Sequence, residues 1–211
     1  MSAEKPRERP ILFNDQMVRA ILEGRKTVTR RPVKATKAHA DGFIMLDHGQ
    51  GWRPYNAFGD FTSDSEGMEY PIACPYGQQG DRLWVRETWG LQVRSYGGGA
   101  GEFIVYRATN PDAIYCRSSE GREYPVKWKP SIHMHRHSSR ILLEITAVRV
   151  ERLHDITPNQ CIAEGAWREK DKELGRGQEA IAAFADLWRS TGGDWDANPW
   201  VWVVEFKRVT P

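Results

Sequence analysis

Near the N-terminus, apolar and polar residues alternate with the period of an α-helix. Between residues 14 and 24, apolar side chains recur at positions 17, 18, 21 and 22, which form one helical face. Asn14 and Asp15 precede this face and are favoured helix N-caps. Gly24 suits the position just after a helix C-terminus. We therefore expect a helix that ends near Gly24, followed by a strand from Thr27, where the pattern changes to alternation.

The C-terminal half contains the other clear elements. Residues 139–153 are rich in β-branched residues and predict one long strand or two in sequence. Thr157 and Pro158 are typical of a helix start, with Gly165 as its end, and residues 177–191 predict a longer amphipathic helix. Residues 199–209 predict an apolar final strand. This order indicates an α+β fold, in which a small, mixed but mostly antiparallel β-barrel is flanked by helices.

Two long segments interrupt this pattern. Residues 32–79 lack periodicity, and residues 91–138 combine strand-like runs with a glycine-rich tip at 95–102. We expect residues 1–10 to form a loose, flexible arm and residues 11–211 to form a single domain with these two insertions.

Composition and charge restrict the possible classes of protein. The formal net charge of +2 gives no global attraction for nucleic acid, so any such site is a local patch. Cys74, Cys116 and Cys161 are far apart and form no CxxC pair, which fits a reduced, cytoplasmic protein. No run approaches the roughly 18 apolar residues of a membrane span. We expect no membrane partner, no cofactor and no obligatory metal, and we favour a monomer.

The sequence "ILEGRKTVTRR" at 21–31 concentrates positive charge and hydroxyls. It could be a helix end followed by a solvated strand edge, or a functional site. A threonine hydroxyl needs a neighbouring base to become a nucleophile, and a lysine is such a base only when its pKa is lowered. The neighbouring arginines would lower the pKa of Lys26, whereas a nearby carboxylate would raise it. Thr27 and Thr29 share one strand face, so either could be the hydroxyl that reacts.

Four separated motifs resemble the ASCH domain, a branch of the PUA-like superfamily. They are "ILEGRKTVTRR", "GDRLWVRE", "LLEITAVRVERLHDIT" with the following "IAEG", and the terminal "VWVVEFKRV". They occur in the family's order and cover about half of the chain, which also resembles the ASCH proteins of phages and prophages. The small family members have almost nothing at the two insertions. The resemblance implies a PUA-like barrel.

One bacterial branch of that family hydrolyses the acetyl amide of 4-acetylcytidine with a lysine, a threonine and a glutamate. These residues match Lys26, Thr29 and Glu164 here. The resemblance thus implies that Thr29 attacks the acyl carbon, Lys26 takes the hydroxyl proton and Glu164 orients Lys26. The partner would be a nucleoside or RNA. Two alternatives remain open: a ribonuclease acting on single-stranded RNA, and a non-catalytic RNA-binding module.

Seven further residues are candidates for substrate or RNA binding. Four are basic or hydroxylic residues of the segment 21–31, and three belong to "GDRLWVRE", where a tryptophan could stack on a base between charged neighbours. They are Arg25, Thr27, Arg30, Arg31, Trp84, Arg86 and Glu87. His133, His135 and His137 alternate and would share one face of a strand, where they could bind a metal or a phosphate. We interpret them first as part of a plain polar strand and assign no metal site.

Overall fold

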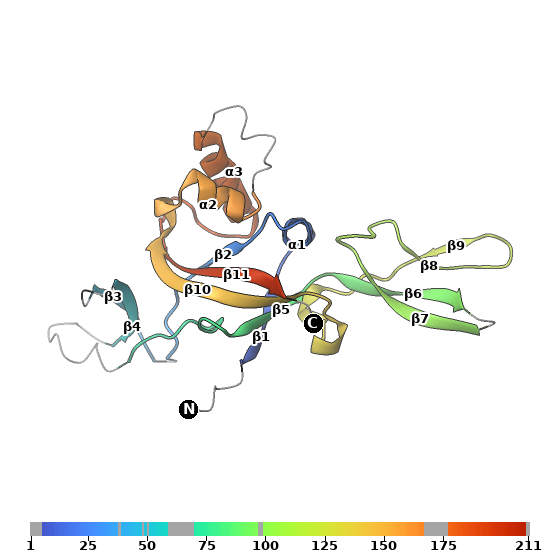
Figure 1. The fold of residues 1–211 in the computed structure, drawn as a ribbon, viewed down its shortest axis with the longest axis horizontal. Coiled ribbons are helices and arrows are strands. Elements are labelled where there is room, and N and C mark those ends of the chain that lie inside the picture. Colours follow the sequence, from blue (N-terminus) through green and yellow to red (C-terminus); the bar gives the residue numbers. More distant parts are fainter. Residues whose placement is uncertain are drawn as a thin grey trace. The chain divides into compact units, whose positions relative to one another are not determined.

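A computed structural model of the chain describes residues 6–37, 39–47, 49, 51–58, 70–96, 99–166 and 177–209. The described part is α+β and rich in strands, as the sequence predicts (Figure 1). The α-helices are α1 (Asp15–Leu22), α2 (Pro158–Ala163) and α3 (Gly177–Ser190). The strands are β1 (Glu8–Leu12), β2 (Val28–Pro32), β3 (Gly42–Asp47), β4 (Trp52–Ala57), β5 (Arg82–Arg86), β6 (Trp89–Tyr96), β7 (Gly99–Tyr106), β8 (Ile114–Arg117), β9 (Glu123–Pro125), β10 (Leu142–Arg152) and β11 (Trp200–Val209). The 3₁₀ turns among the described residues are η2 (Ser131–His133), η3 (Arg136–Ser138) and η4 (Leu153–Asp155).

The largest sheet has five strands in the order β1-β5-β10-β11-β2. Strand β1 pairs with β5 in parallel, whereas β10 pairs with β5 and β2 pairs with β11 in antiparallel fashion. Three separate hairpins are formed by β3–β4, β6–β7 and β8–β9. No closed barrel is formed by the strands that the structure describes, so the predicted barrel is not found there.

The chain divides into two compact units. Unit 1 consists of residues 1–26, 81–144 and 207–211, and unit 2 consists of residues 27–80 and 145–206.

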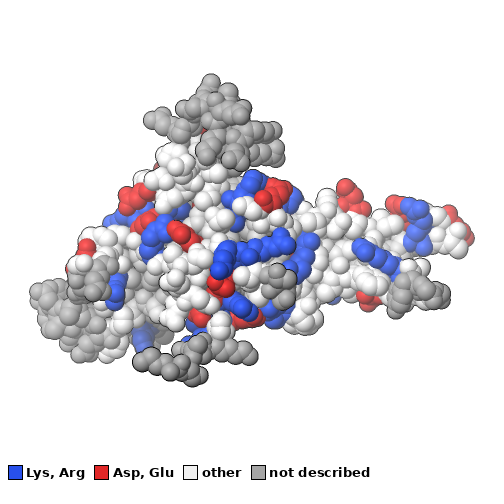
Figure 2. Space-filling model, in the orientation of Figure 1, with Lys and Arg blue, Asp and Glu red and all other residues white. Residues whose placement is uncertain are grey.

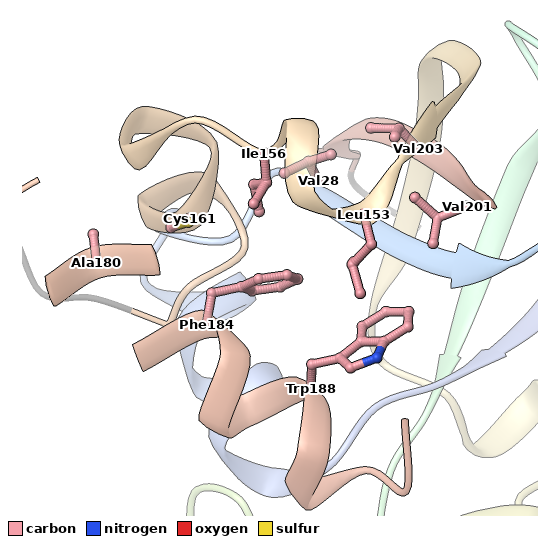
Figure 3. Close-up of a cluster of buried hydrophobic side chains, with 9 residues drawn as sticks. All are labelled: Val28, Leu153, Ile156, Cys161, Ala180, Phe184, Trp188, Val201 and Val203. Carbon is pink, nitrogen blue, oxygen red and sulfur yellow. The ribbon is translucent and has the colours of Figure 1, made fainter. Parts of the chain in front are cut away.

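In unit 2, helices α2 and α3 pack against strands β2 and β11 through a core of nine buried side chains (Figure 3). Their burial is the principal stabilising contribution of this unit, because each removes apolar surface from water. The nine are Val28, Leu153, Ile156, Cys161, Ala180, Phe184, Trp188, Val201 and Val203. Helix α2 begins as predicted: the hydroxyl of Thr157 accepts a hydrogen bond from the backbone N–H of Gln160, whose side chain accepts from the N–H of Thr157.

In unit 1, helix α1 also has its predicted caps. The side chain of Asn14 accepts a hydrogen bond of 2.9 Å from the backbone N–H of Met17. Gly24 follows the helix with φ of +74°, a conformation that favours glycine. The link after β5 is joined to the link before β10 by an ion pair, in which the guanidinium of Arg140 donates two hydrogen bonds of 2.9 Å to the carboxylate of Glu87.

Three local expectations are wrong. Strand β1 begins at Glu8, so residues 8–10 belong to a sheet and not to the arm. Residues 32–79 contain the hairpin β3–β4, and their stretch 59–69 lies outside the described residues. The histidines at 133–137 do not form a strand, because η2 and η3 turn the chain there, and the rings of His135 and His137 stack with centroids 5.6 Å apart.

Candidate functional site

The charged segment 24–31 changes from a helix end to a strand within a few residues. The backbone N–H of Lys26 donates to the carbonyl of Ala20 at 3.0 Å, which closes the last turn after α1. The backbone N–H of Thr27 donates to the carbonyl of Ala163 at 2.8 Å, at the end of α2. From Val28 the segment forms strand β2, whose Thr29 lies opposite Val204 of β11.

Polar burial is concentrated at this segment. Among the described residues, eight polar or charged residues are buried, and four of these are Lys26, Thr29, Arg30 and Glu164, with exposed fractions of 2%, 1%, 2% and 3%. Burying a charge is costly unless it is paired, so buried ionisable groups mark built ion-pair networks or functional sites. A solvated strand edge is therefore the wrong interpretation of Thr29 and Arg30.

Glu164 lies at the C-cap of helix α2, where its own N–H donates to the carbonyl of Gln160. Gly165 follows with φ of +79°, which ends the helix. The residue before Glu164, Ala163, accepts a hydrogen bond from the N–H of Thr27. This bond fixes the end of α2 to the beginning of β2.

The guanidinium of Arg30 connects two carboxylates. Its Nη1 lies 3.3 Å from Oε1 of Glu164 and its Nη2 lies 3.2 Å from Oε2 of Glu151. The side chain of Arg30 is fully buried, and its Nε has no hydrogen-bond partner within the described part of the chain. Arg30 therefore holds Glu164 in place and does not present its charge at the surface.

The network continues along strands β10 and β11. Glu151 also accepts a hydrogen bond from Arg149, which in turn donates to Glu205. Burial opposes the charge of Arg149, but its hydrogen bonds to Glu151 and Glu205 outweigh this and raise its pKa. Acidic and basic side chains therefore alternate in a chain of ion pairs, which begins at a buried carboxylate and ends at two half-exposed side chains. Its members, in order, are Glu164, Arg30, Glu151, Arg149 and Glu205.

A pocket of about 250 Å³ opens beside this series in unit 2. It is lined by Thr27, Val28, Thr146, Arg149, Gln160, Ala163, Glu205 and Phe206. Hydroxyl, amide, guanidinium and carboxylate groups therefore meet there with an aromatic and two aliphatic side chains. A pocket of this size is smaller than those that hold drug-sized ligands, and it suits a fragment such as one nucleobase.

The structure separates the two threonines that the sequence could not distinguish. Thr27 is exposed and lines the pocket, whereas Thr29 is buried and is not among its lining residues. Thr27, Thr29 and Glu164 belong to unit 2, and Lys26 belongs to unit 1. In its own unit, Nζ of Lys26 lies 5.5 Å from the ring centroid of Phe13.

The other basic residues of the motif have partners of their own. Arg25 forms an ion pair with Glu23. Arg31 is hydrogen-bonded to the hydroxyl of Tyr76; burial raises the pKa of that hydroxyl, and Arg31 opposes the rise. Neither arginine is among the lining residues of the pocket.

Trp84, Arg86 and Glu87 lie in unit 1 and are not part of the pocket. The guanidinium carbon of Arg86 lies 5.5 Å from a ring centroid of Trp84, while Arg86 donates to the carbonyls of Ser131 and Ile132. Glu87 is buried in its pair with Arg140. The predicted stacking wall is thus a set of packed side chains, with Trp84 half-buried.

The sequence analysis missed Arg149, Glu151, Gln160 and Glu205. The available signals were the alternating charges of "RVE" in a β-branched strand and the single acidic residue of the apolar run "WVVEF". A charge repeated at alternate strand positions indicates one polar face. The pairing of Arg149 with Glu205, which are 56 residues apart, was not visible in the sequence.

The thiol of Cys161 is also buried near Arg30 and Glu164. Burial raises the pKa of Cys161 to about 12, with the charge of Arg30 opposing this rise and that of Glu164 adding to it. Cys161 therefore remains a thiol at neutral pH and acts as a small apolar side chain.

No family model, curated protein or solved structure matches this chain. Within the described residues, no group of three or more His, Cys, Asp or Glu side chains is arranged to hold a metal ion. None of the described helices is long and apolar enough to span a bilayer. Basic and acidic side chains are interspersed on the face drawn in Figure 2, in keeping with the net charge of +2.

Proposed function

We propose that the protein is an amide hydrolase that removes the acyl group from 4-acetylcytidine or a similar acylated nucleoside. The observation that carries this proposal is the burial of Lys26, Thr29 and Glu164, the three residues that match the lysine, threonine and glutamate of the ASCH amidohydrolase branch. Lysine and glutamate side chains are rarely fully buried unless they are paired, because burial removes the hydration of their charges. A PUA-like arrangement of the whole chain belongs to the same proposal.

The chemistry requires three steps. A threonine hydroxyl attacks the acyl carbon while Lys26 takes its proton, which forms a C–O bond and a tetrahedral intermediate. The C–N bond then breaks, and the proton passes to the leaving amine, which is cytidine. Water hydrolyses the resulting threonine ester and releases acetate, which restores the hydroxyl.

The network gives Glu164 a defined part in this scheme. Because Oε1 of Glu164 is held by Arg30, the carboxylate cannot rotate freely. A fixed carboxylate can orient a lysine, as the resemblance implies for Lys26, without a reorganisation cost during the reaction.

The attacking hydroxyl is the point on which geometry and resemblance differ. The resemblance assigns it to Thr29, whereas the pocket favours Thr27, which is exposed and lines it. The pocket also supports the substrate class, because its volume of about 250 Å³ suits a single base.

The test is incubation of the purified protein with 4-acetylcytidine and chromatographic measurement of released cytidine and acetate. We expect Lys26→Ala and Glu164→Gln to lower kcat by at least about 100-fold, which is the low end of general acid–base effects. Replacement of the reacting threonine by alanine is expected to abolish turnover, so Thr27→Ala and Thr29→Ala are compared directly.

The matched control is Glu144→Gln, which removes a strand carboxylate that pairs with Lys207 at 2.8 Å in unit 1. It is expected to leave turnover unchanged. Absence of cytidine release by the wild-type protein would overturn the proposal, and turnover that survives Lys26→Ala would exclude the mechanism.

A further inference from the structure

Arg149 and Glu205 pair in the lining of the pocket, and each keeps one hydrogen-bonding atom outside the network. Arg149 uses Nε toward Glu151 and Nη1 toward Oε1 of Glu205. Its Nη2 and the Oε2 of Glu205 have no hydrogen bond within the described part of the chain. The two side chains are 34% and 43% exposed, and both line the pocket.

This pair presents a hydrogen-bond donor beside an acceptor. Such a pair is complementary to a planar group that carries an acceptor beside a donor. The amino edge of cytosine is such a group, because its acceptor N3 lies next to the exocyclic N4–H. Carboxylates accept well from cytosine N4–H, and a guanidinium donates well to acceptor atoms of a base. Acylation of N4 leaves one N–H in place, so the same edge exists in substrate and product.

The surrounding residues suit a flat ring. Phe206, Val28 and Ala163 supply apolar lining, and Thr27 and Gln160 add polar groups. Glu151, which is itself paired with Arg30, accepts a hydrogen bond from Nε of Arg149, so the guanidinium is held before a ligand arrives. Preorganised groups bind with a smaller loss of side-chain entropy.

We infer that Arg149 and Glu205 determine specificity by reading the amino edge of a cytosine-type base: Oε2 of Glu205 accepts N4–H, and Nη2 of Arg149 donates to N3. The choice of cytosine rests on the proposed function. The inference adds the two residues that hold the base and the atoms that they contact.

The test uses ligands that carry no acyl group, so it does not depend on turnover. Cytidine and N4,N4-dimethylcytidine are titrated against the wild-type protein and Glu205→Ala by calorimetry. Dimethylation removes the N–H that Glu205 would accept, and we expect it to weaken wild-type binding by about tenfold or more, as for loss of a hydrogen bond to a charged group. In Glu205→Ala the two ligands should bind with nearly equal affinity.

Two further variants keep the test decisive. Glu144→Ala, which removes a carboxylate outside the pocket, should discriminate between the ligands as the wild type does. Arg149→Lys, which keeps the charge, should weaken cytidine binding at least a few-fold, because an ammonium cannot reproduce the guanidinium geometry. Thermal unfolding of each variant checks that it is folded.

The outcomes separate this inference from the proposed function. Discrimination that disappears in Glu205→Ala supports the inference even if no acylated substrate is hydrolysed. Discrimination that persists in Glu205→Ala overturns it even if 4-acetylcytidine is hydrolysed. Failure of the wild type to bind cytidine overturns it as well.

Discussion

Arg30 shows how strongly a single residue can constrain a buried region. Its fully buried guanidinium lies between Glu164, which is buried, and Glu151, which is partly exposed. Arg30→Met preserves the length of the side chain but leaves the Glu164 carboxylate without this cation. We expect a loss of about 3–5 kcal/mol in the free energy of unfolding, the usual cost of removing one partner of a buried pair. Urea unfolding of the two proteins measures it.

The second substitution that tests this argument is Glu164→Gln, made alone and together with Arg30→Met. Removing the uncompensated charge should recover part of the stability lost in Arg30→Met, so the two effects should not add. Strict additivity would mean that the two side chains do not interact in the folded state. Glu151 loses its pairing with Arg30 only in the variants that carry Arg30→Met, so the loss that persists in the double variant includes that pairing.

Burial and charge also compete at Glu87 in unit 1. Burial raises the pKa of its carboxyl above the ordinary value of 4.5, and the hydrogen bonds and charge of Arg140 oppose this only in part. The folded state therefore binds this proton more tightly than the unfolded chain does. The contribution of the group to stability is full below its unfolded pKa and is lost as the pH rises through its folded pKa.

Glu87→Gln removes this titration and serves as the reference. The wild-type free energy of unfolding, minus that of Glu87→Gln, should fall as the pH is raised from about 4 to about 7. Urea unfolding of both proteins at several pH values gives this difference. A difference that stays constant, or that rises with pH, would contradict the prediction.

At the scale of elements, the turn after helix α3 depends on a close approach that only glycine allows. A Cβ atom on Gly193 would lie 2.3 Å from Nε1 of Trp188, which belongs to the core of unit 2. We expect Gly193→Ala to lower the free energy of unfolding by about 1–3 kcal/mol, as other overpacked cores do. Gly42→Ala is the control, since no atom lies within 4 Å of its Cβ position and its φ is ordinary. Equal stability of the two variants would exclude the clash.

The elements that could be predicted from the sequence are those whose signals are local. Asn14 and Thr157 start α1 and α2 as expected, because a cap is a contact between residues three positions apart. Strands β10 and β11 follow from runs of β-branched and aromatic residues. The hairpin β3–β4 was missed because its short strands stand among residues without clear periodicity. The turns at His133 and His137 were missed because alternating polar residues do not reveal whether a partner strand exists.

At the scale of the whole molecule, the site was only half visible in the sequence. The segment 24–31 and Glu164 stand out through composition and family resemblance, and Lys26, Thr29, Arg30 and Glu164 are buried. Arg149 and Glu205 could not be paired, since their contact depends on how two distant strands meet. Division into two units was hidden for the same reason, because it follows from long-range contacts.

The sheets differ in their number of strands and in the burial of their residues, and this should produce differences in local stability. Strands β10 and β11 are interior to a five-stranded sheet, and β11 has five buried residues between 201 and 206. Strands β8 and β9 form a sheet of two strands, and all three residues of β9 are exposed. Two-stranded hairpins are marginal in water, so local opening of β8–β9 should require much less free energy than opening of β11.

Hydrogen–deuterium exchange followed by mass spectrometry measures this difference. After correction for intrinsic exchange rates, amides of β11 should be protected at least about 100-fold more than amides of β8 and β9, which corresponds to roughly 3 kcal/mol of opening free energy. The hairpin β6–β7 is the internal comparison, because its eight paired positions make it the longest two-stranded sheet described. It should show intermediate protection. If β8–β9 is protected as strongly as β11, its stability must come from contacts beyond its own two strands.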